Sequence, residues 1–190
     1  MGELATRNPG ASVFIPSGNE SYKAALYDPT IMGANKYWRY ATRSNTAPGN
    51  QIGGLPNQAN YTLGNPNDPF YSVTQSSIYD PNQNYLTDVG SFSGSASYYG
   101  TYDQSGNVLE WTEGIGPNGP GDHNIDGGGW DSPAQLLRAF QRASTGNTGE
   151  GSDAGFRLVS IEPVPEPTGT LTGLLCLGLA AMRRRRRSAF

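Results

Sequence analysis

Glycine, proline and asparagine recur so often in this chain that long helices and strands cannot form over residues 1–161. The sequence has 26 glycines and 14 prolines, and each proline fixes its own φ and disfavours helix in the residue before it. The stretch Gly49–Pro69 consists mostly of such residues and predicts a loop. Eleven tyrosines, six phenylalanines and three tryptophans supply the apolar surface that disordered chains lack. The sequence therefore predicts one loop-rich α+β domain over residues 1–161.

The predicted regular elements are few and short. The segment Asn19–Tyr27 predicts a helix, with Ser17 or Asn19 as its N-cap. Asp28-Pro29 closes this segment because proline cannot continue a helix. A second short helix is predicted within Pro133–Arg142. Extended runs between turns predict strands at three places, which are Tyr71–Thr74, Val108–Trp111 and Phe156–Ile161.

Residues 162–190 differ from the rest of the chain. Val164-Pro165-Glu166-Pro167 is an extended break, Thr168–Met182 has no charged residue, and Arg183–Arg187 follow directly. The apolar run is shorter than the about 20 residues of a bilayer span, but arginine side chains extend its reach. The alternative is a buried C-terminal helix with a basic end that binds nucleic acid. An arginine cluster directly after an apolar run favours a membrane boundary, with the cluster on the cytoplasmic side.

The three-part order of Pro163–Ser188 resembles the PEP-CTERM sorting signal of Gram-negative bacteria that make extracellular polysaccharide. The resemblance implies that the protein is exported and processed by an exosortase, a membrane protease-transpeptidase. It would be held in the inner membrane by residues 168–187 during transit and then reach the cell envelope or the exterior. The partners implied are the exosortase and, at the surface, extracellular polysaccharide or other envelope proteins.

Charge and cysteine content exclude two classes of function for residues 1–161. Five of the 13 basic residues are Arg183–Arg187, and Glu162 and Glu166 are two of the 16 acidic ones, which leaves a net charge of −6 before residue 162. This acidic balance argues against nucleic acid as a partner. The only cysteine, Cys176, lies in the apolar run. No disulfide within the chain and no thiol chemistry in the domain is therefore expected.

The segment Tyr99–Trp111 is the strongest candidate for a site. Ser105-Gly106-Asn107 predicts a tight turn, because Gly106 can adopt a positive φ. Asp103 precedes the turn and Glu110 follows it, so both carboxylates and the turn carbonyls can converge. Such hard oxygen donors suit Ca²⁺. The competing interpretation is a hairpin with two solvated acids, and the spacing alone favours it.

Several motifs together resemble one known family. The pattern Y-x-x-x-G-N-V-x-E-W, followed by GGGW, L-R-x-x-x-R and GFRLVS, resembles the C-terminal half of the formylglycine-generating enzyme, or sulfatase-modifying factor, family. The segments IPSGNESYKAALYDP, TRSNTAPGN and VGSF-x₅-YYGTYDQSGNV resemble upstream parts of the same family in the same order. The resemblance extends over Val13–Ile161. It implies a C-type-lectin-like α+β fold with a small twisted antiparallel sheet, to which residues 162–190 would add a C-terminal apolar helix.

Two expectations about the start of the chain follow. Family members have a further N-terminal third that residues 1–161 do not match. The first residues, MGELATRNPGASVF, also lack the basic and apolar regions of a secretory signal peptide. An exported protein needs such a signal, so we expect the domain to be truncated at its N-terminus.

The resemblance also implies metal ligands. In the family a structural Ca²⁺ is bound at this turn, which assigns it here to the side chains of Asp103 and Glu110 and to the carbonyls of Gly106 and Val108. A second family site uses an asparagine with the next carbonyl and a later acidic residue. Its candidates in this chain are Asn60 with Tyr61, and Asp80 with Asn82.

Catalytic chemistry is not expected. The family's oxidase binds copper through two cysteines located a few residues beyond a Gly-Gly-Ser-Trp motif. The matching stretch Gly128–Leu137 has no cysteine, and serine or alanine cannot supply the soft thiolate that Cu(I) requires. An iron-dependent branch needs three histidines, whereas His123 is the only one here. We therefore assign no catalytic residue and expect a non-catalytic binding or structural module, the alternative being an enzyme whose active residues lie in a missing N-terminal part.

The remaining polar and aromatic residues have simpler interpretations. His123 is expected in a surface loop over residues 121–124. Three acids near the glycine run suggest a glycosidase-like pair but are more simply solvated: Asp122, Asp126 and Asp131. Three arginines are expected to form structural ion pairs: Arg138, Arg142 and Arg157. Three tryptophans are expected as core anchors, with an aromatic sugar platform as the alternative: Trp38, Trp111 and Trp130.

Overall fold

The computed structural model describes residues 7–65, 67–119, 122–139, 141, 143–146 and 151–161. The chain divides into two compact units, Met1–Val159 and Ser160–Phe190. The predicted sorting tail and C-terminal apolar helix, residues 162–190, lie outside the described residues. Within the described part, no helix is both long and apolar enough to cross a membrane.

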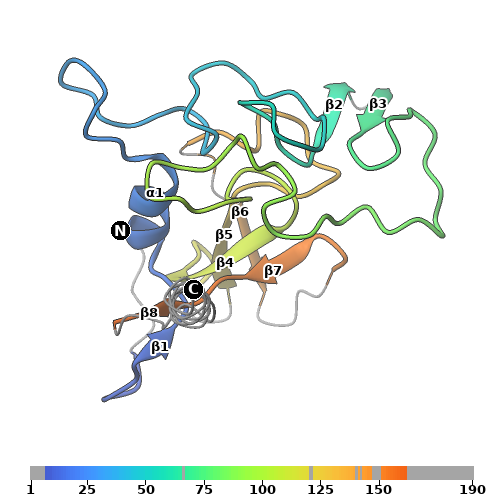
Figure 1. The fold of residues 1–190 in the computed structure, drawn as a ribbon. Coiled ribbons are helices and arrows are strands. Elements are labelled where there is room, and N and C mark those ends of the chain that lie inside the picture. Colours follow the sequence, from blue (N-terminus) through green and yellow to red (C-terminus); the bar gives the residue numbers. More distant parts are fainter. Residues whose placement is uncertain are drawn as a thin grey trace, which may run out of the picture. The chain divides into compact units, whose positions relative to one another are not determined.

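The described residues of the first unit form a loop-rich fold with one helix and several short strands (Figure 1). The helix is α1 (Gly18–Leu26). The strands are β1 (Val13–Phe14), β2 (Thr62–Asn65), β3 (Asp68–Tyr71), β4 (Leu109–Ile115), β5 (Asp122–Asp126), β6 (Ala143–Gly146) and β7 (Ala154–Phe156), and β8 (Val159–Ser160) lies at the boundary between the units.

The largest sheet has the strand order β6-β5-β4-β7. Strands β4, β5 and β6 are antiparallel neighbours, as expected, whereas β7 runs parallel to β4. Burial alternates along β4, and Glu110, Thr112 and Gly114 face the interior. The register pairs Glu110 with Asp126 on one side and with Gly155 on the other. The predicted strand over Val108–Trp111 is thus confirmed as the start of β4, the strand that leads away from the candidate site.

The stretch Gly49–Pro69 is not entirely loop, because it contains β2 and the start of β3. These strands form an antiparallel hairpin in which Asn65 pairs with Asp68 and Gly64 with Pro69. Gly64 has a φ of 101°, and a Cβ there would lie 2.3 Å from the Asp68 carbonyl oxygen. The glycine that made the sequence look like a loop therefore permits the close pairing. The strand predicted over Tyr71–Thr74 is wrong beyond Tyr71, where the chain turns and the Gln75 amide donates to the Tyr71 carbonyl.

Helix α1 confirms the first helix prediction within a residue at each end. Ser17 is its N-cap and forms a capping box with Glu20, so two otherwise unpaired donors at the helix start are satisfied. The helix ends at Leu26 because Asp28-Pro29 cannot continue it. Ala25 and Leu26 are buried against Ala41 in an apolar cluster.

The second predicted helix, within Pro133–Arg142, is wrong for the described residues 133–139 and 141, which form successive turns. The Leu136 amide donates to the Pro133 carbonyl and the Gln141 amide to the Arg138 carbonyl. These bonds span three residues rather than the four of an α-helix. Leu137 is held in place instead by burial, at 2% exposure, in a cluster with Tyr40, Ala59 and Tyr61.

Three tyrosines are part of the core, beside aliphatic residues. Tyr40, Tyr61 and Tyr85 are each at most 4% exposed. The Tyr61 hydroxyl donates to the Pro48 carbonyl, and burial raises the pKa of Tyr61 to about 12. Buried phenols need such partners, so this core fixes the surrounding loops by hydrogen bonds as well as by packing.

Candidate functional site

The turn before β4 has the positive φ that the sequence predicts at Gly106. Three of its residues have positive φ: Asp103 (59°), Gly106 (88°) and Asn107 (70°). A Cβ at Gly106 would lie 2.2 Å from the Asn60 carbonyl oxygen, so only glycine fits. The Asn107 amide donates to that same carbonyl at 2.7 Å, and the Gly106 amide donates to the Gly127 carbonyl at 2.8 Å. The loop at Asn60 and the glycine run after β5 therefore position the turn.

Two buried asparagines connect the turn to neighbouring loops. The Asn60 side-chain amide donates to the Asn107 side-chain oxygen at 2.9 Å and to the Tyr85 carbonyl at 2.8 Å. The Asn107 side chain also accepts from the Thr87 amide and donates to the Thr87 carbonyl. The role of Asn107 was missed in the sequence, although an asparagine after a turn glycine is the kind of residue that bonds to nearby backbone.

The two predicted acidic ligands have different partners. Glu110 is 7% exposed, and both of its carboxylate oxygens accept hydrogen bonds from Arg157. Arg157 also donates to the Tyr102 carbonyl at 3.1 Å, so its guanidinium connects β4 to the segment before the turn. Asp103 accepts from the Gly90 amide at 2.8 Å. The structural ion pair expected for Arg157 is therefore present.

The pKa values of the acidic side chains at this turn are shifted by burial and by neighbouring charges. Burial raises the pKa of Glu110, and the nearby charges of Asp103 and Asp126 add to the shift while Arg157 opposes it. Burial likewise raises the pKa of Asp103, opposed by the Gly90 hydrogen bond and by Arg157. Both ionised carboxylates are thus disfavoured by their surroundings, and a further cation would stabilise them.

The donor set fits Ca²⁺ in chemistry, because Asp103, Glu110 and the carbonyls of Gly106 and Val108 are all hard oxygen donors. Both Glu110 oxygens are already engaged by Arg157. A cation at Glu110 would therefore share the carboxylate with Arg157 or displace it. Among the described residues, this turn included, no group of three or more His, Cys, Asp or Glu side chains is arranged to hold a metal ion, so a cation here would depend on the backbone carbonyls.

The sequence matches the model of one protein family, described as the sulfatase-modifying factor enzyme 1-like domain, over residues 31–161. This match covers more than two thirds of the chain. The chain belongs to this family. Among curated proteins, none matches the chain.

Three solved structures are similar to the chain. The crystal structure of CarF superposes with a TM-score of 0.50 at 22% identity, over 82% of this chain and 51% of that one. PvdO from Pseudomonas aeruginosa gives 0.45 at 20% identity, over 77% and 51%. Treponema denticola variable protein 1 gives 0.40 at 18% identity, over 77% and 46%. The family match and the likeness to CarF show that the chain has the sulfatase-modifying factor fold. The chain spans about half the length of the three structures.

Two residues are buried in the stretch that the sequence resemblance matches to the oxidase's copper-binding segment. The Ser132 hydroxyl accepts from the Gly129 amide at 2.9 Å, and Ser132 is 6% exposed. Leu137 lies in the apolar cluster around Tyr61. No thiolate is available along Gly128–Leu137, as the sequence indicates.

The candidates for a second calcium site are separated by an aromatic side chain. Asn60 is buried and donates to the Tyr85 carbonyl, whereas Asp80 is exposed and its own amide donates to the Tyr85 hydroxyl at 2.8 Å. The Asp80 carboxylate accepts from the Asn82 amide within its own loop. Tyr61, the remaining candidate, is fully buried.

The predicted surface loop at residues 121–124 is largely strand, because Asp122–Asp126 form β5. His123 is half-buried, and its ring lies 5.2 Å from that of Trp111. Asp122 accepts two hydrogen bonds from Asn118 and closes the turn between β4 and β5. Asp122 therefore has a structural role, which does not support a glycosidase-like acid pair.

The other expected anchors differ in their contacts. The Arg138 guanidinium donates to the Tyr40 hydroxyl at 3.2 Å, and Arg142 lies outside the described residues.

Trp130 is buried, at 9% exposure. Its ring packs almost parallel to Tyr85 at 4.7 Å. Trp38 and Trp111 are half-buried, so the expectation of a core anchor is confirmed for Trp130 alone among the three.

Proposed function

We propose that this chain is a non-catalytic binding or structural module of the sulfatase-modifying factor fold, stabilised by Ca²⁺ and sorted to the cell surface. The observation that carries the proposal is the state of Ser132–Leu137. The oxidase needs two thiolates in this region, and here a hydrogen-bonded serine and a buried leucine are part of the core. The turn before β4 contains Asp103 and Glu110, which the family resemblance assigns to a structural cation rather than to a reaction.

The calcium part of the proposal rests on the charge balance at the turn. Asp103 and Glu110 are carboxylates with raised pKa values, and Arg157 is the guanidinium that opposes both shifts. We assign the cation to the side chains of Asp103 and Glu110 and to the carbonyls of Gly106 and Val108. Bound Ca²⁺ would neutralise buried charge and fix the turn without taking part in a reaction.

Thermal unfolding of the full chain with Ca²⁺ and with a chelator tests this assignment. Ligand that binds the folded state alone raises stability by about 2.7 kcal/mol at a hundred times its Kd, so chelation should lower the Tm of the wild type. Glu110→Gln should abolish the difference, while Asp68→Asn, which changes an exposed acid in β3, should retain it. An identical melt of the wild type with and without chelator would remove the calcium site from the proposal.

The sorting part rests on the sequence of Pro163–Ser188. Deleting Pro163–Phe190 from the expressed protein is expected to prevent exosortase processing and to change the fraction in which the protein is found. The matched control replaces Arg183–Arg187 with five lysines, which keeps the charge. Unchanged fractionation and processing after the deletion would contradict surface sorting.

A further inference from the structure

Three loop segments line an open groove of about 520 Å³, and no residue of the proposed calcium turn is part of its lining. This volume lies within the roughly 300–1,000 Å³ of typical small-ligand sites. The lining contains one indole, one guanidinium and many hydroxyl and amide side chains, contributed by Trp38, Thr42, Arg43, Ser44, Thr46, Asn57, Ser93 and Ser97. Thr42 already bonds to Asn57, and Ser44 to Thr46, so the indole and the guanidinium are the main groups that the wall offers to a ligand.

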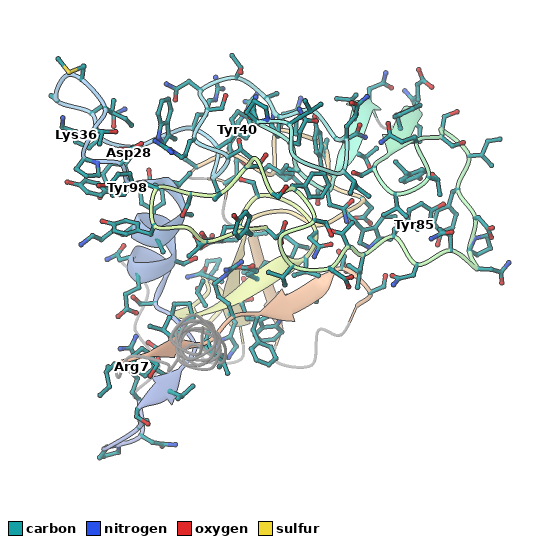
Figure 2. The ribbon with its side chains drawn as sticks, viewed as in Figure 1. Arg7, Asp28, Lys36, Tyr40, Tyr85 and Tyr98 are labelled. Atoms are coloured by element: carbon teal, nitrogen blue, oxygen red, sulfur yellow. The ribbon has the colours of Figure 1, made fainter. Side chains whose placement is uncertain are left out.

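One buried carboxylate fixes both the indole and the guanidinium. Asp28 has no exposed surface, and its Oδ2 accepts from Trp38 Nε1 at 3.1 Å and from Arg43 Nη2 at 3.3 Å. Its Oδ1 accepts from the Thr30 amide at 2.9 Å. Figure 2 labels Asp28, near Lys36, whose backbone carbonyl accepts from the Asp28 amide. The two side chains are thus positioned before any ligand arrives, which reduces the entropy lost on binding.

The backbone around the groove is strained at two non-glycine residues. Arg43 has a φ of 57° and Asn57 a φ of 53°, a region that arginine adopts uncommonly. The Asn57 side chain accepts from the Thr42 hydroxyl at 2.7 Å and donates to the Ala47 carbonyl at 3.2 Å. Strain of this kind persists only where surrounding contacts hold it, and it gathers at functional sites.

The fixed side chains retain unused binding capacity. Among the described ring–ring contacts, none involves Trp38, whereas the rings of Tyr79, Tyr85 and Trp130 pack on one another. The Arg43 side chain is 48% exposed, and the ion pair described for it is the one with Asp28. An indole can pack against the apolar C–H face of a sugar ring, and free guanidinium donors suit its hydroxyl oxygens.

Charge favours a neutral ligand. Asp28 balances Arg43 within the groove wall, and residues 1–161 carry a net charge of −6. A polyanionic chain would be repelled by this domain at low salt. We propose that the groove lined by Trp38 and Arg43 binds a short segment of a neutral polysaccharide. This assignment rests on the proposed binding function and names its ligand class.

Isothermal titration of the full chain with maltohexaose, cellohexaose and laminarihexaose tests the proposal. Trp38→Ala and Arg43→Ala should each weaken binding of the preferred hexasaccharide by about tenfold or more, as expected for loss of a stacking surface or a charged donor. Ser93→Trp should block the groove without removing any contact of Asp28. This variant therefore tests the groove even if Trp38→Ala and Arg43→Ala fail to fold. Two controls should bind normally: Arg39→Ala, an exposed neighbour of Trp38, and Tyr79→Ala.

The Tyr79 control is distant from the groove. Its ring packs at 5.5 Å from that of Tyr85, which lies at the opposite side of the view from Asp28 in Figure 2. A loss of binding in this variant as large as in Trp38→Ala would therefore indicate a general effect on the fold and contradict the groove assignment.

The outcomes separate the ligand class from the broader function. Two further titrants, trigalacturonate and a hexaglutamate peptide, represent an anionic sugar and an acidic peptide. If either binds in a Trp38-dependent manner while the neutral hexasaccharides do not, the neutral glycan assignment is wrong and the binding function stands. If none of the five ligands binds, or if Ser93→Trp leaves binding unchanged, the groove is not a glycan site.

Discussion

The ion pair between Glu110 and Arg157 gives the sharpest test of how the turn is held. The Glu110 side chain is 9% exposed and the Arg157 side chain 26% exposed, and two hydrogen bonds join them. Breaking a buried pair by removing one partner costs about 3–5 kcal/mol, because the other charge is left uncompensated. Since water reaches a quarter of the Arg157 side chain, we expect Arg157→Met to cost about 3 kcal/mol, at the lower end of that range.

Replacing the acidic partner of the pair should cost less than replacing Arg157. Glu110→Gln leaves a guanidinium that is partly hydrated and still donates to the Tyr102 carbonyl, so we expect about 1–2 kcal/mol, within the range for an unsatisfied buried partner. The double variant should recover part of the loss, because residues in contact typically couple by about 0.5–3 kcal/mol. Urea unfolding at pH 7 in chelator, monitored by tryptophan fluorescence, measures all three values.

The asymmetry is the decisive part of this prediction. Ca²⁺ should restore Arg157→Met by more than it stabilises the wild type, because the freed carboxylate no longer has to be shared with a guanidinium. An Arg157→Met loss equal to or smaller than that of Glu110→Gln would show that Glu110 is not a buried charge that depends on Arg157. The reasoning about the turn would then be refuted.

Two other perturbations follow from single residues. Burial raises the pKa of Asp28, but hydrogen bonds from Thr30 and Trp38 and the charge of Arg43 outweigh it and leave the pKa at about 2, below its usual 3.8. The stability that ionised Asp28 contributes is therefore present above pH 3.8 and lost as the pH falls towards 2. Asp28→Asn should lower the Tm at pH 7 and reduce the fall in Tm between pH 4 and pH 2. An equal fall in Tm for wild type and variant would contradict this. Gly106→Ala should lower the free energy of unfolding in urea by about 2 kcal/mol or more, because the new Cβ would meet the Asn60 carbonyl. The control Gly119→Ala should cost less, because Gly119 also has a positive φ but a Cβ there would have no atom within 4 Å. Equal losses would show that the close contact is not the cause.

Local signals predicted those parts of the fold that neighbouring residues determine. Helix α1 followed from a capping residue and a terminating proline, and the start of β4 followed from a short apolar run after a turn. Pro133–Arg142 has helical composition, yet its described residues form turns, because burial of Leu137 beside Tyr61 outweighs local preference. The β2–β3 hairpin was missed because Gly64 and Pro69 normally interrupt strands.

The candidate site shows the same division. The positive φ at Gly106 was predictable from the motif around it, whereas those at Asp103 and Asn107 were not. The engagement of both Glu110 oxygens by Arg157 depends on two segments 47 residues apart, which β7 brings beside β4. The fixing of Trp38 and Arg43 by buried Asp28 was equally invisible in the sequence, since each residue alone looks like an ordinary surface or core position.

The most direct test of the non-catalytic claim is an oxidation assay on the purified full chain. The protein is incubated with Cu(I), oxygen and a cysteine-containing peptide, and aldehyde formation is followed by hydrazide labelling and mass spectrometry. Because Gly128–Leu137 supplies no thiolate, we expect no aldehyde above a protein-free copper control. Copper-dependent aldehyde that accumulates in proportion to the protein concentration would contradict the account.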